Sequence, residues 1–567
     1  MRNAMRSGAT LAAAMLVLLT GISCQPGSIQ LGPDGKKVRT LSMAEIDRKL
    51  AQYVQVEMAF DATGLPRPQR ELLRKLIEAG EMIERAFWAQ AFRDGWKIRK
   101  QLEGSDDPRA AKLHHLLLLN AIPFDRFNEF EPFLGESERP AGAGFYPEDL
   151  TKEELEAYIG EHPEQKEALL NPYTVVHRQG ERLNAVPFHV EYRKWVEPAS
   201  KLLFEASQLA RNRSLKKFLR SRSVALLTDN YYQSDLDWID LRRNTIELVF
   251  GPYETYEDHL MGVKAAYEAT IAVKDPEESE RLQIYVKNLN ALEQNLPIDG
   301  RFKRGEIALD SPMVVVTDIF RGGDIGHGYQ PVAANLPNDP RVHEAKGTKK
   351  TFWKNMMKAR LEKIIQPMAR EILAEDQLDH MTGQAYFNVV LMHEIAHALG
   401  PRWIGEGGDR RPVTELLQEE YSAIEEGKAD VAGLVSLEWF MDREIIPASL
   451  APQHYVSYLG GLFRSIRFGI TEAHGKASMI AINWHREREA LVYDSGTGRW
   501  RVDFDKIPDS IRELARELLM IEATGDYERS RNLSEKYAVK GPDVKATLKR
   551  VDDLPVDIEP IYSVKWE

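Results

Sequence analysis

The stretch LMHEIAHALGP (residues 391–401) places two histidines four residues apart, with a glutamate directly after the first. Its apolar flanks predict a buried helix over about residues 384–399, which the following glycine and proline would end. Residues at i and i+4 project from one face of a helix, so His393 and His397 can bind one zinc ion. Glu394 lies beside them and can reach water on that ion without binding the ion itself. A polar helix that binds no metal could have the same sequence. A third metal ligand from elsewhere in the chain would therefore distinguish a zinc site from such a helix.

A second predicted helix offers that ligand. The stretch ELLQEEYSAIEEGKADVAGLVSLEWF (415–440), with Thr414 as a plausible N-cap, carries Glu426 and Asp430 at i and i+4. Glutamate-ligated zinc peptidases use this arrangement: the glutamate completes the ligands, and the second acid accepts a hydrogen bond from a ligand histidine. We expect Glu425 to support the ligands as well. The competing interpretation is a solvated acidic face, which the apolar residues that follow disfavour.

Three protein ligands would leave one position of the metal open. Zn²⁺ in such a site lowers the pKa of bound water towards about 7 and polarises a carbonyl group. Glu394 would take the proton of the water and deliver it to the leaving amine. The oxyanion that develops needs a hydrogen-bond donor or a cation as well. A fourth protein ligand would instead indicate a structural zinc site, because such sites are usually closed.

Composition is that of an ordinary soluble globular protein. The chain has 567 residues, of which 43% are hydrophobic and 29% charged, enough for a large core and more than one structural unit. The net charge is −12 and no long basic run occurs, which argues against nucleic acid as a main partner.

Periodicity predicts a mainly α fold with a minor β component. Apolar residues recur at three- and four-residue spacing in the segment 72–92 and again in 359–375, where Pro367 should kink or divide the helix. A β-branched run at 311–320 predicts a strand, and alternating residues at 490–504 predict a hairpin. The predicted organisation is a signal (1–24), a flexible tether (25–41), a mostly helical region that contributes to the substrate cleft (42–310) and a catalytic region with both motif helices (311–567).

The N-terminus, MRNAMRSGATLAAAMLVLLTGISC, is typical of an export signal, with a positive start and a short apolar core. The single cysteine, Cys24, falls where a bacterial lipoprotein signal places its lipidated residue, although Gly21 stands where an aliphatic residue is usual. The alternative is a plain secretory signal. We therefore expect a lipid anchor in a membrane of the bacterial cell envelope. Gln25 carries no inner-membrane retention signal, which favours the outer membrane, facing the periplasm.

The motifs resemble the dipeptidyl-peptidase III family, in a branch with a five-residue histidine motif. The resemblance also rests on phrases that follow in the expected order: FGPYETYED (250–258), ANLPND (334–339), EAKGTKK (344–350) and EAHGKASMI (472–480). No such phrase precedes residue 250. The resemblance implies a zinc exopeptidase that removes dipeptides from the N-termini of short peptides. It also implies two lobes with a wide cleft between them.

The same resemblance implies roles for residues outside the metal motif. His474 falls on a histidine that stabilises the transition state or holds the substrate, and Tyr256 falls on a tyrosine that assists the transition state. Glu254 falls on a glutamate that recognises the free amino group. Asn335 and Asn338 fall on asparagines that bind the N-terminal end of the peptide. Each has a plainer alternative: turn formation for the asparagines, a helix start for the histidine, a solvated loop acid for the glutamate, and packing for the tyrosine.

Two departures from the family pattern stand out. The histidine motif lacks the extra residue of better-known members, and Asp430 is one methylene shorter than the usual glutamate. The main hypothesis is a lipid-anchored zinc peptidase acting on peptides. The alternatives are a catalytically impaired, peptide-binding envelope lipoprotein that retains its zinc site, and a zinc hydrolase of non-peptide amides. The sequence defines neither the substrate length nor an oligomeric state.

Overall fold

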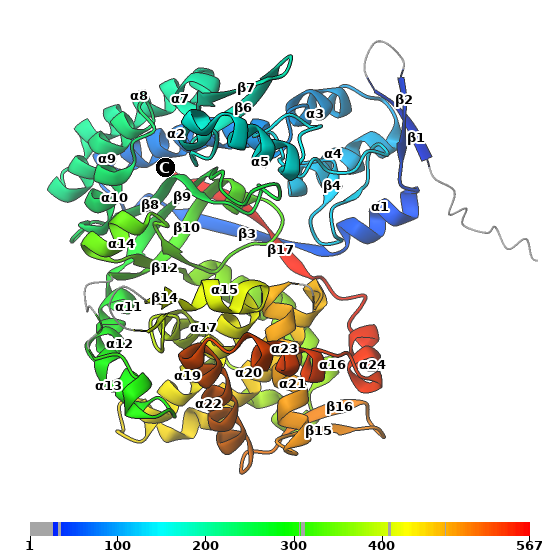
Figure 1. Cartoon of the computed structure of the whole chain (residues 1–567), viewed down its shortest axis with the longest axis vertical. Helices are drawn as coiled ribbons and strands as arrows, with labels where there is room; N and C mark the ends of the chain where they lie inside the picture. The colour runs from blue at the N-terminus through cyan, green and yellow to red at the C-terminus, as the bar shows by residue number, and fades with distance from the viewer. Residues whose placement is uncertain (1–26, 32–35, 306, 308–311, 406–409, 471) are drawn as a thin grey trace, which may run out of the picture.

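The computed structural model describes residues 27–31, 36–305, 307, 312–405, 410–470 and 472–567. Figure 1 shows two lobes, an upper one that contains most of the strands and a lower one built mainly of helices. Buried apolar side chains form one connected core through both lobes. No helix in the described part of the chain is long and apolar enough to cross a membrane.

The upper lobe is built around a five-stranded sheet in the order β11-β12-β10-β9-β8. Helix α2 packs against β9 and β10, and α8 packs against α2. The strands of this sheet are β8 (Ile246–Glu254), β9 (Ala266–Asp275), β10 (Met313–Gly323), β11 (Ala333–Leu336) and β12 (Lys349–Trp353). The helices are α1 (Met43–Leu50), α2 (Arg67–Ala91), α3 (Gly95–Glu103), α4 (Pro108–Asn120), α5 (Lys152–Glu161), α6 (Lys166–Leu169), α7 (Phe188–Glu191), α8 (Arg193–Leu209), α9 (Arg213–Ala225), α10 (Tyr232–Ile239) and α14 (Pro340–Lys346).

Smaller strand pairs complete this lobe. They are β1 (Gly27–Leu31) with β2 (Lys36–Thr40), β3 (Tyr53–Asp61) with β17 (Asp557–Lys565), β4 (Phe124–Asp125) with β5 (Glu131–Pro132), and β6 (Thr174–Gln179) with β7 (Arg182–Pro187). Strand β17 is the last element of the chain, and it runs parallel to β3. The C-terminal segment therefore returns from the lower lobe to the upper lobe (Figure 1).

The lower lobe holds both motif helices, α17 (Gly383–Ala396) and α19 (Tyr421–Met441). Its other helices are α11 (Pro276–Arg281), α12 (Gln283–Lys287), α13 (Leu289–Asn295), α15 (Lys354–Arg360), α16 (Gln366–Ile372), α18 (Val413–Leu417), α20 (Ala451–Ser465), α21 (Ala473–Glu487), α22 (Ile507–Thr524), α23 (Tyr527–Tyr537) and α24 (Pro542–Arg550). Its strands are β13 (Trp403–Ile404) with β14 (Arg411–Pro412), and β15 (Leu491–Asp494) with β16 (Arg499–Val502).

Several local predictions are confirmed. Helix α2 covers the segment 72–92, β10 covers most of 311–320, and β15 and β16 form the hairpin expected at 490–504. Pro367 lies in the first turn of α16, directly after a π-helical segment over Leu361–Ile365 that ends α15. The chain thus stays helical through Pro367, and the π-helical turn before it accommodates a proline that has no N–H to donate to the preceding turn.

The tether prediction for residues 25–41 was wrong where the structure describes that segment. β1 and β2 pair as antiparallel strands, and Ile29 is only 1% exposed because it packs into the core. Burial of an apolar side chain favours this order over a flexible coil. The signal prediction for 1–24, with Cys24, lies outside the described residues.

Two other boundaries also differ from the prediction. The division at 310/311 cuts the sheet, because β8 and β9 precede it and β10 follows, hydrogen-bonded to β9. The helix expected over 415–440 breaks at Gln418, whose φ of +51° is incompatible with a right-handed helix. Thr414 therefore lies within the short α18 and does not cap α19, which begins at Tyr421.

Candidate metal centre

Helices α17 and α19 lie against each other with little space between their backbones. The approach depends on Gly433 of α19: a Cβ atom there would lie 2.9 Å from the carbonyl carbon of Met392 and 3.0 Å from the backbone nitrogen of His393. Only glycine permits this contact without a shift of one helix. The residue before the first motif histidine is thus in direct backbone contact with the helix that carries Glu426.

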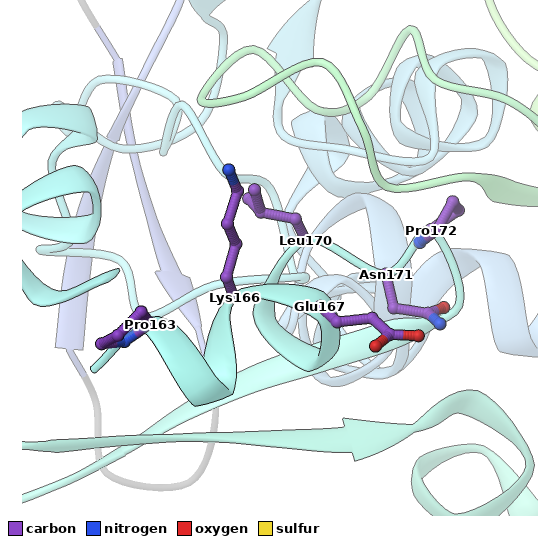
Figure 2. Close-up of a pocket in the computed structure, with 6 residues that line it drawn as sticks. All are labelled: Pro163, Lys166, Glu167, Leu170, Asn171 and Pro172. Atoms are coloured by element: carbon purple, nitrogen blue, oxygen red, sulfur yellow. The ribbon is translucent and has the colours of Figure 1, made fainter. Parts of the chain in front are cut away.

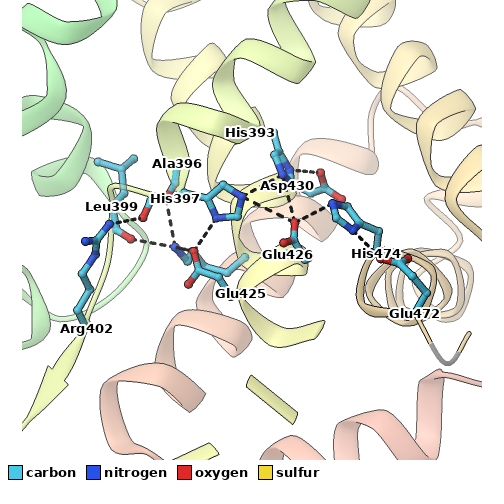
Figure 3. Close-up of polar contacts among 11 residues, drawn as sticks. His393, Ala396, His397, Leu399, Arg402, Glu425, Glu426, Asp430, Glu472 and His474 are labelled. Atoms are coloured by element: carbon cyan, nitrogen blue, oxygen red, sulfur yellow. Dashed lines mark hydrogen bonds and ion pairs between the residues drawn. The ribbon is translucent and has the colours of Figure 1, made fainter. Parts of the chain in front are cut away.

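His393, His397 and Glu426 converge on one point (Figure 3). The His393 Nε2 atom lies 3.1 Å from His397 Nε2 and 3.2 Å from Glu426 Oε2, and His397 Nε2 lies 3.7 Å from the same oxygen. All three residues are half-buried. Glu426 Oε2 is shielded from water and accepts no hydrogen bond of normal geometry from the described residues. A buried carboxylate oxygen of this kind calls for a cation, so the three side chains fit a divalent metal.

Each ligand histidine is oriented from its other ring nitrogen. His393 Nδ1 lies 2.6 Å from Asp430 Oδ1, and His397 Nδ1 lies 2.7 Å from Glu425 Oε1. These carboxylates favour a proton on Nδ1 and direct the Nε2 lone pairs to the common point. The aspartate is therefore long enough, because the close approach of the two helices makes up for its missing methylene.

Lys428 is a supporting residue that the sequence analysis missed. Its Nζ donates to Glu425 Oε1 at 2.8 Å and to the carbonyl oxygens of Ala396 and Leu399 at 3.1 and 3.0 Å, so it connects α19 to the end of α17. Burial alone would raise the pKa of Glu425, but the charges of Lys428 and His397 lower it well below its usual value. The only sequence feature that pointed to Lys428 was its position two residues after Glu426.

Glu394 follows His393 on α17 and is half-buried. Its carboxylate forms no hydrogen bond or ion pair with any other residue in the described ranges. This distinguishes it from Glu425 and Asp430, whose carboxylates are held by histidines. A carboxylate beside a metal group and without a protein partner is available to accept a proton from water.

His474 joins the metal cluster from a third helix, α21. Its Nε2 lies 3.2 Å from Glu426 Oε2, and its Nδ1 lies 2.9 Å from Glu472 Oε1 (Figure 3). Burial would lower the pKa of His474, but the carboxylates of Glu426 and Glu472 raise it to about 10. These carboxylates therefore favour the protonated imidazole. Glu472, which also caps α21 through Gly475 N, was not singled out from the sequence, although it lies two residues before His474.

The predicted peptide-binding residues lie in the upper lobe. Asn338 Nδ2 donates to Glu254 Oε2 at 3.2 Å and to the Tyr253 carbonyl at 3.1 Å, which brings two of them together. Burial raises the pKa of Glu254, and the Asn338 amide opposes that shift. Asn335 is exposed on β11. Tyr256 is 72% exposed after β8, and no hydrogen bond among the described residues joins it to the metal cluster.

A separate hollow of about 510 Å³ lies on the upper lobe (Figure 2). It is lined by Pro163, Lys166, Glu167, Leu170, Asn171 and Pro172. None of the predicted site residues lines it. The hollow is therefore not an alternative to the metal group as the candidate functional site.

Comparison with known proteins places this geometry in a family. The model of peptidase family M49 matches residues 172–400. Nudix hydrolase 3 of Arabidopsis thaliana is 31% identical over 584 residues, which cover 93% of this chain and 74% of that protein.

Solved structures are similar over most of the chain. The structure of DPP III from Caldithrix abyssi is 41% identical, with a TM-score of 0.89, and the match covers 91% of this chain and 99% of that one. Dipeptidyl-peptidase III from Corallococcus sp. strain EGB is 34% identical, with a TM-score of 0.83, covering 91% and 96%. These matches confirm the predicted fold class. The chain therefore belongs to peptidase family M49, the dipeptidyl-peptidase III family, and is a metallopeptidase.

Proposed function

We propose that this metallopeptidase is a zinc-dependent exopeptidase that releases dipeptides from the N-termini of peptides. The observation that carries the proposal is the donor set: two imidazole nitrogens and one carboxylate oxygen, all within 4.8 Å of one another. Two nitrogens and one oxygen suit zinc, and three protein ligands are typical of catalytic rather than structural zinc sites. The family and the dipeptidyl-peptidase III structures support the same activity.

The side chains of the chain divide the work of hydrolysis. When bound, zinc lowers the pKa of water at its open position and polarises the scissile carbonyl. Glu394 accepts the proton of the attacking water and passes it to the nitrogen of the leaving peptide. His474, which lies beside Glu426, donates to the carbonyl oxygen as negative charge develops there.

Recognition of a free N-terminus is the role proposed for the upper-lobe residues. The Glu254 carboxylate attracts the ammonium group of the peptide, while Asn338 holds that carboxylate and Asn335 contacts the peptide backbone. A fixed distance between the Glu254–Asn338 pair and the metal would limit the released product to two residues. Tyr256 is proposed to donate a hydrogen bond in the transition state.

The test is mass spectrometry of the products from a peptide library with free and acetylated N-termini, incubated with the zinc-loaded protein. We expect dipeptides from the free peptides only. Cleavage of acetylated peptides at internal bonds would contradict the exopeptidase proposal, and an absence of any cleavage would favour the impaired, peptide-binding alternative.

We also propose the lipid anchor at Cys24 and a location in the cell envelope, on the strength of the N-terminal pattern alone. Fractionation of cells that produce the full chain tests this. The protein should be in the membrane fraction, and the variant Cys24→Ser should leave it. A soluble protein with an unmodified cysteine would contradict the anchor.

A further inference from the structure

Lys350, on β12 of the upper-lobe sheet, is buried without a partner. It is 3% exposed, and its ammonium group makes no hydrogen bond or ion pair with any residue in the described part of the chain. The preceding residue differs: Lys349 is equally buried, but its Nζ donates to Glu247 Oε1 at 2.7 Å. The ammonium nitrogen of Lys350 is not itself fully shielded from solvent. A cation on a largely buried side chain without a bonded partner can still act on a charge nearby.

The fold directs Lys350 towards helix α17. Alternate residues of a strand share one face, so Lys350 and Phe352 project from the same side of β12. The Phe352 ring lies 6.5 Å from the Phe387 ring, centre to centre, and Phe387 belongs to α17. On that helix Phe387 and Glu394 are seven residues apart, which is about two turns, so they share a face as well. The two faces that meet at the phenylalanines therefore carry Lys350 and Glu394.

On its other side, Lys350 adjoins a strand that we propose binds the peptide. Asn335 of β11 is directly opposite Lys350 in the antiparallel ladder between β11 and β12. Residues that are directly opposite in such a ladder project from the same face of the sheet. Lys350 thus lies between the proposed peptide-binding asparagine and the helix that carries the proposed base.

The charges around Lys350 agree with this placement. Burial lowers the pKa of Lys350 to about 8, and the strongest charge acting against this shift is that of Glu394. Arg402 and Lys428 lower the pKa further, while Glu425 raises it. Glu394 is therefore the principal electrostatic partner of Lys350.

We propose that Lys350 is a positioning residue for Glu394, whose carboxylate its ammonium group attracts towards the strand that receives the peptide. The inference rests on the proposed role of Glu394 as the base. It gives a function to the motif EAKGTKK (344–350), which the metal centre does not use. A carboxylate held in one orientation near the attacked carbonyl raises the rate, whereas a freely rotating one is aligned only part of the time.

The test compares Lys350→Met with Lys349→Met, its neighbour on the opposite face of β12. Loss of a residue that supports a catalytic group typically lowers activity by about 10- to 100-fold. We expect Lys350→Met to lower kcat by that factor, with KM and bound zinc little changed. Lys350→Arg, which keeps the charge, should recover part of the rate. Lys349→Met should lower the melting temperature, because it leaves Glu247 unpaired, while kcat of the folded protein stays near that of the parent.

A second comparison separates positioning from fold stability. Introduced into Glu394→Gln, which has no carboxylate to position, Lys350→Met should cause no further loss of the residual rate. Lys350→Gln repeats the measurement if the methionine variant does not fold. Unchanged kcat in the neutral variants, or an equal loss in the Glu394→Gln background, would overturn the inference. Full activity of Glu394→Gln itself would instead overturn the proposed base.

Discussion

The two lobes differ in how firmly they hold the side chains of the candidate site. In the lower lobe, the candidate metal residues come from the C-terminal end of α17, from α19 and from the first turn of α21, and both histidines of the HEIAH motif are held by carboxylates at 2.6 and 2.7 Å. In the upper lobe, the proposed peptide-binding residues lie at strand ends and in loops. There Asn338 contacts Glu254, while Tyr256 is largely exposed.

This difference indicates a division between chemistry and recognition. Catalytic groups act best when their orientation is fixed before the substrate arrives, because no energy is then spent on arranging them. Recognition groups can instead acquire contacts from the bound peptide. Substitutions in the lower lobe should therefore lower kcat or metal affinity, and substitutions in the upper lobe should mainly raise KM.

The largest effect should come from Glu394→Gln. General acid–base catalysis contributes about 100- to 10,000-fold to the rate, so kcat should fall by at least about a hundredfold. Bound zinc, measured by elemental analysis, should remain at one per chain because Glu394 is not a ligand. Unchanged turnover would show that a residue other than Glu394 accepts the proton from water.

Gly433→Ala should break the fixed geometry of the lower lobe. The added methyl group would contact the backbone of Met392 and His393, so α17 and α19 must move apart and separate the ligands. Disturbed support of a metal site typically costs about 10- to 100-fold in metal affinity or activity, and we expect a loss of that size in a competition assay with a zinc chelator.

Gly461→Ala is the matched control for this substitution. Gly461 lies within α20 of the same lobe, and a Cβ atom there would meet no atom within 4 Å. Alanine in a helix interior is more favourable than glycine by about 1 kcal/mol, so this variant should keep its zinc affinity and unfold at a slightly higher temperature. Equal zinc affinities in the two variants would show that the helix contact does not position the ligands.

Glu254→Gln should change recognition more than chemistry. A hydrogen bond to a charged group contributes about 1.5–3 kcal/mol, which corresponds to a KM about 10- to 100-fold higher for peptides with a free N-terminus. The kcat value should stay within a few-fold of the parent, since no contact joins Glu254 to the metal cluster among the described residues. A large fall in kcat with unchanged KM would remove the proposed division between the lobes.

The sequence predicted the lower lobe better than the upper lobe, for a physical reason. The spacings of His393, His397, Glu426 and Asp430 are local, and helix geometry alone converts them into shared faces. What brings the two helices together is a glycine, Gly433, whose role depends on a partner far away in the chain. No periodicity marks such a residue.

The upper lobe depends on contacts that are distant in sequence. The pairing of β17 with β3 joins the two ends of the described chain, and no local pattern identifies the partner of a strand. The pair of β1 and β2 was predicted to be a tether because the segment is rich in glycine, proline and polar residues, whereas the burial of Ile29 that anchors it depends on the rest of the fold. The surroundings of a buried side chain such as Lys350 are likewise visible only in the fold.

The last comparison concerns the stability of the two lobes under acid. Burial, and to a lesser extent the charge of Arg488, lowers the pKa of His485 in the lower lobe to about 3, and burial lowers that of His454 to about 4. Both are neutral when folded, whereas unfolded histidines titrate near 6.5. Their contribution to stability is complete above pH 6.5 and is lost as the pH falls below it, at about 1.4 kcal/mol per pH unit for each histidine.

In the upper lobe the sensitive group is Glu257. Burial would raise its pKa, but Arg126 and Arg139 lower it to about 2. The stability from this carboxylate is therefore complete above its unfolded pKa of 4.5 and is lost only as the pH falls from there towards 2. Burial also lowers the pKa of His114 and His259 in the upper lobe, but less strongly. Between pH 6.5 and 5 acid should therefore weaken the lower lobe more than the upper lobe, so limited proteolysis at pH 5 should cut the lower lobe first. In His485→Gln, which can still bond to Ser510, the decrease in melting temperature from pH 7 to pH 5 should be smaller than in the parent. An upper lobe cleaved first at pH 5 would reverse the assignment of acid sensitivity to the two lobes.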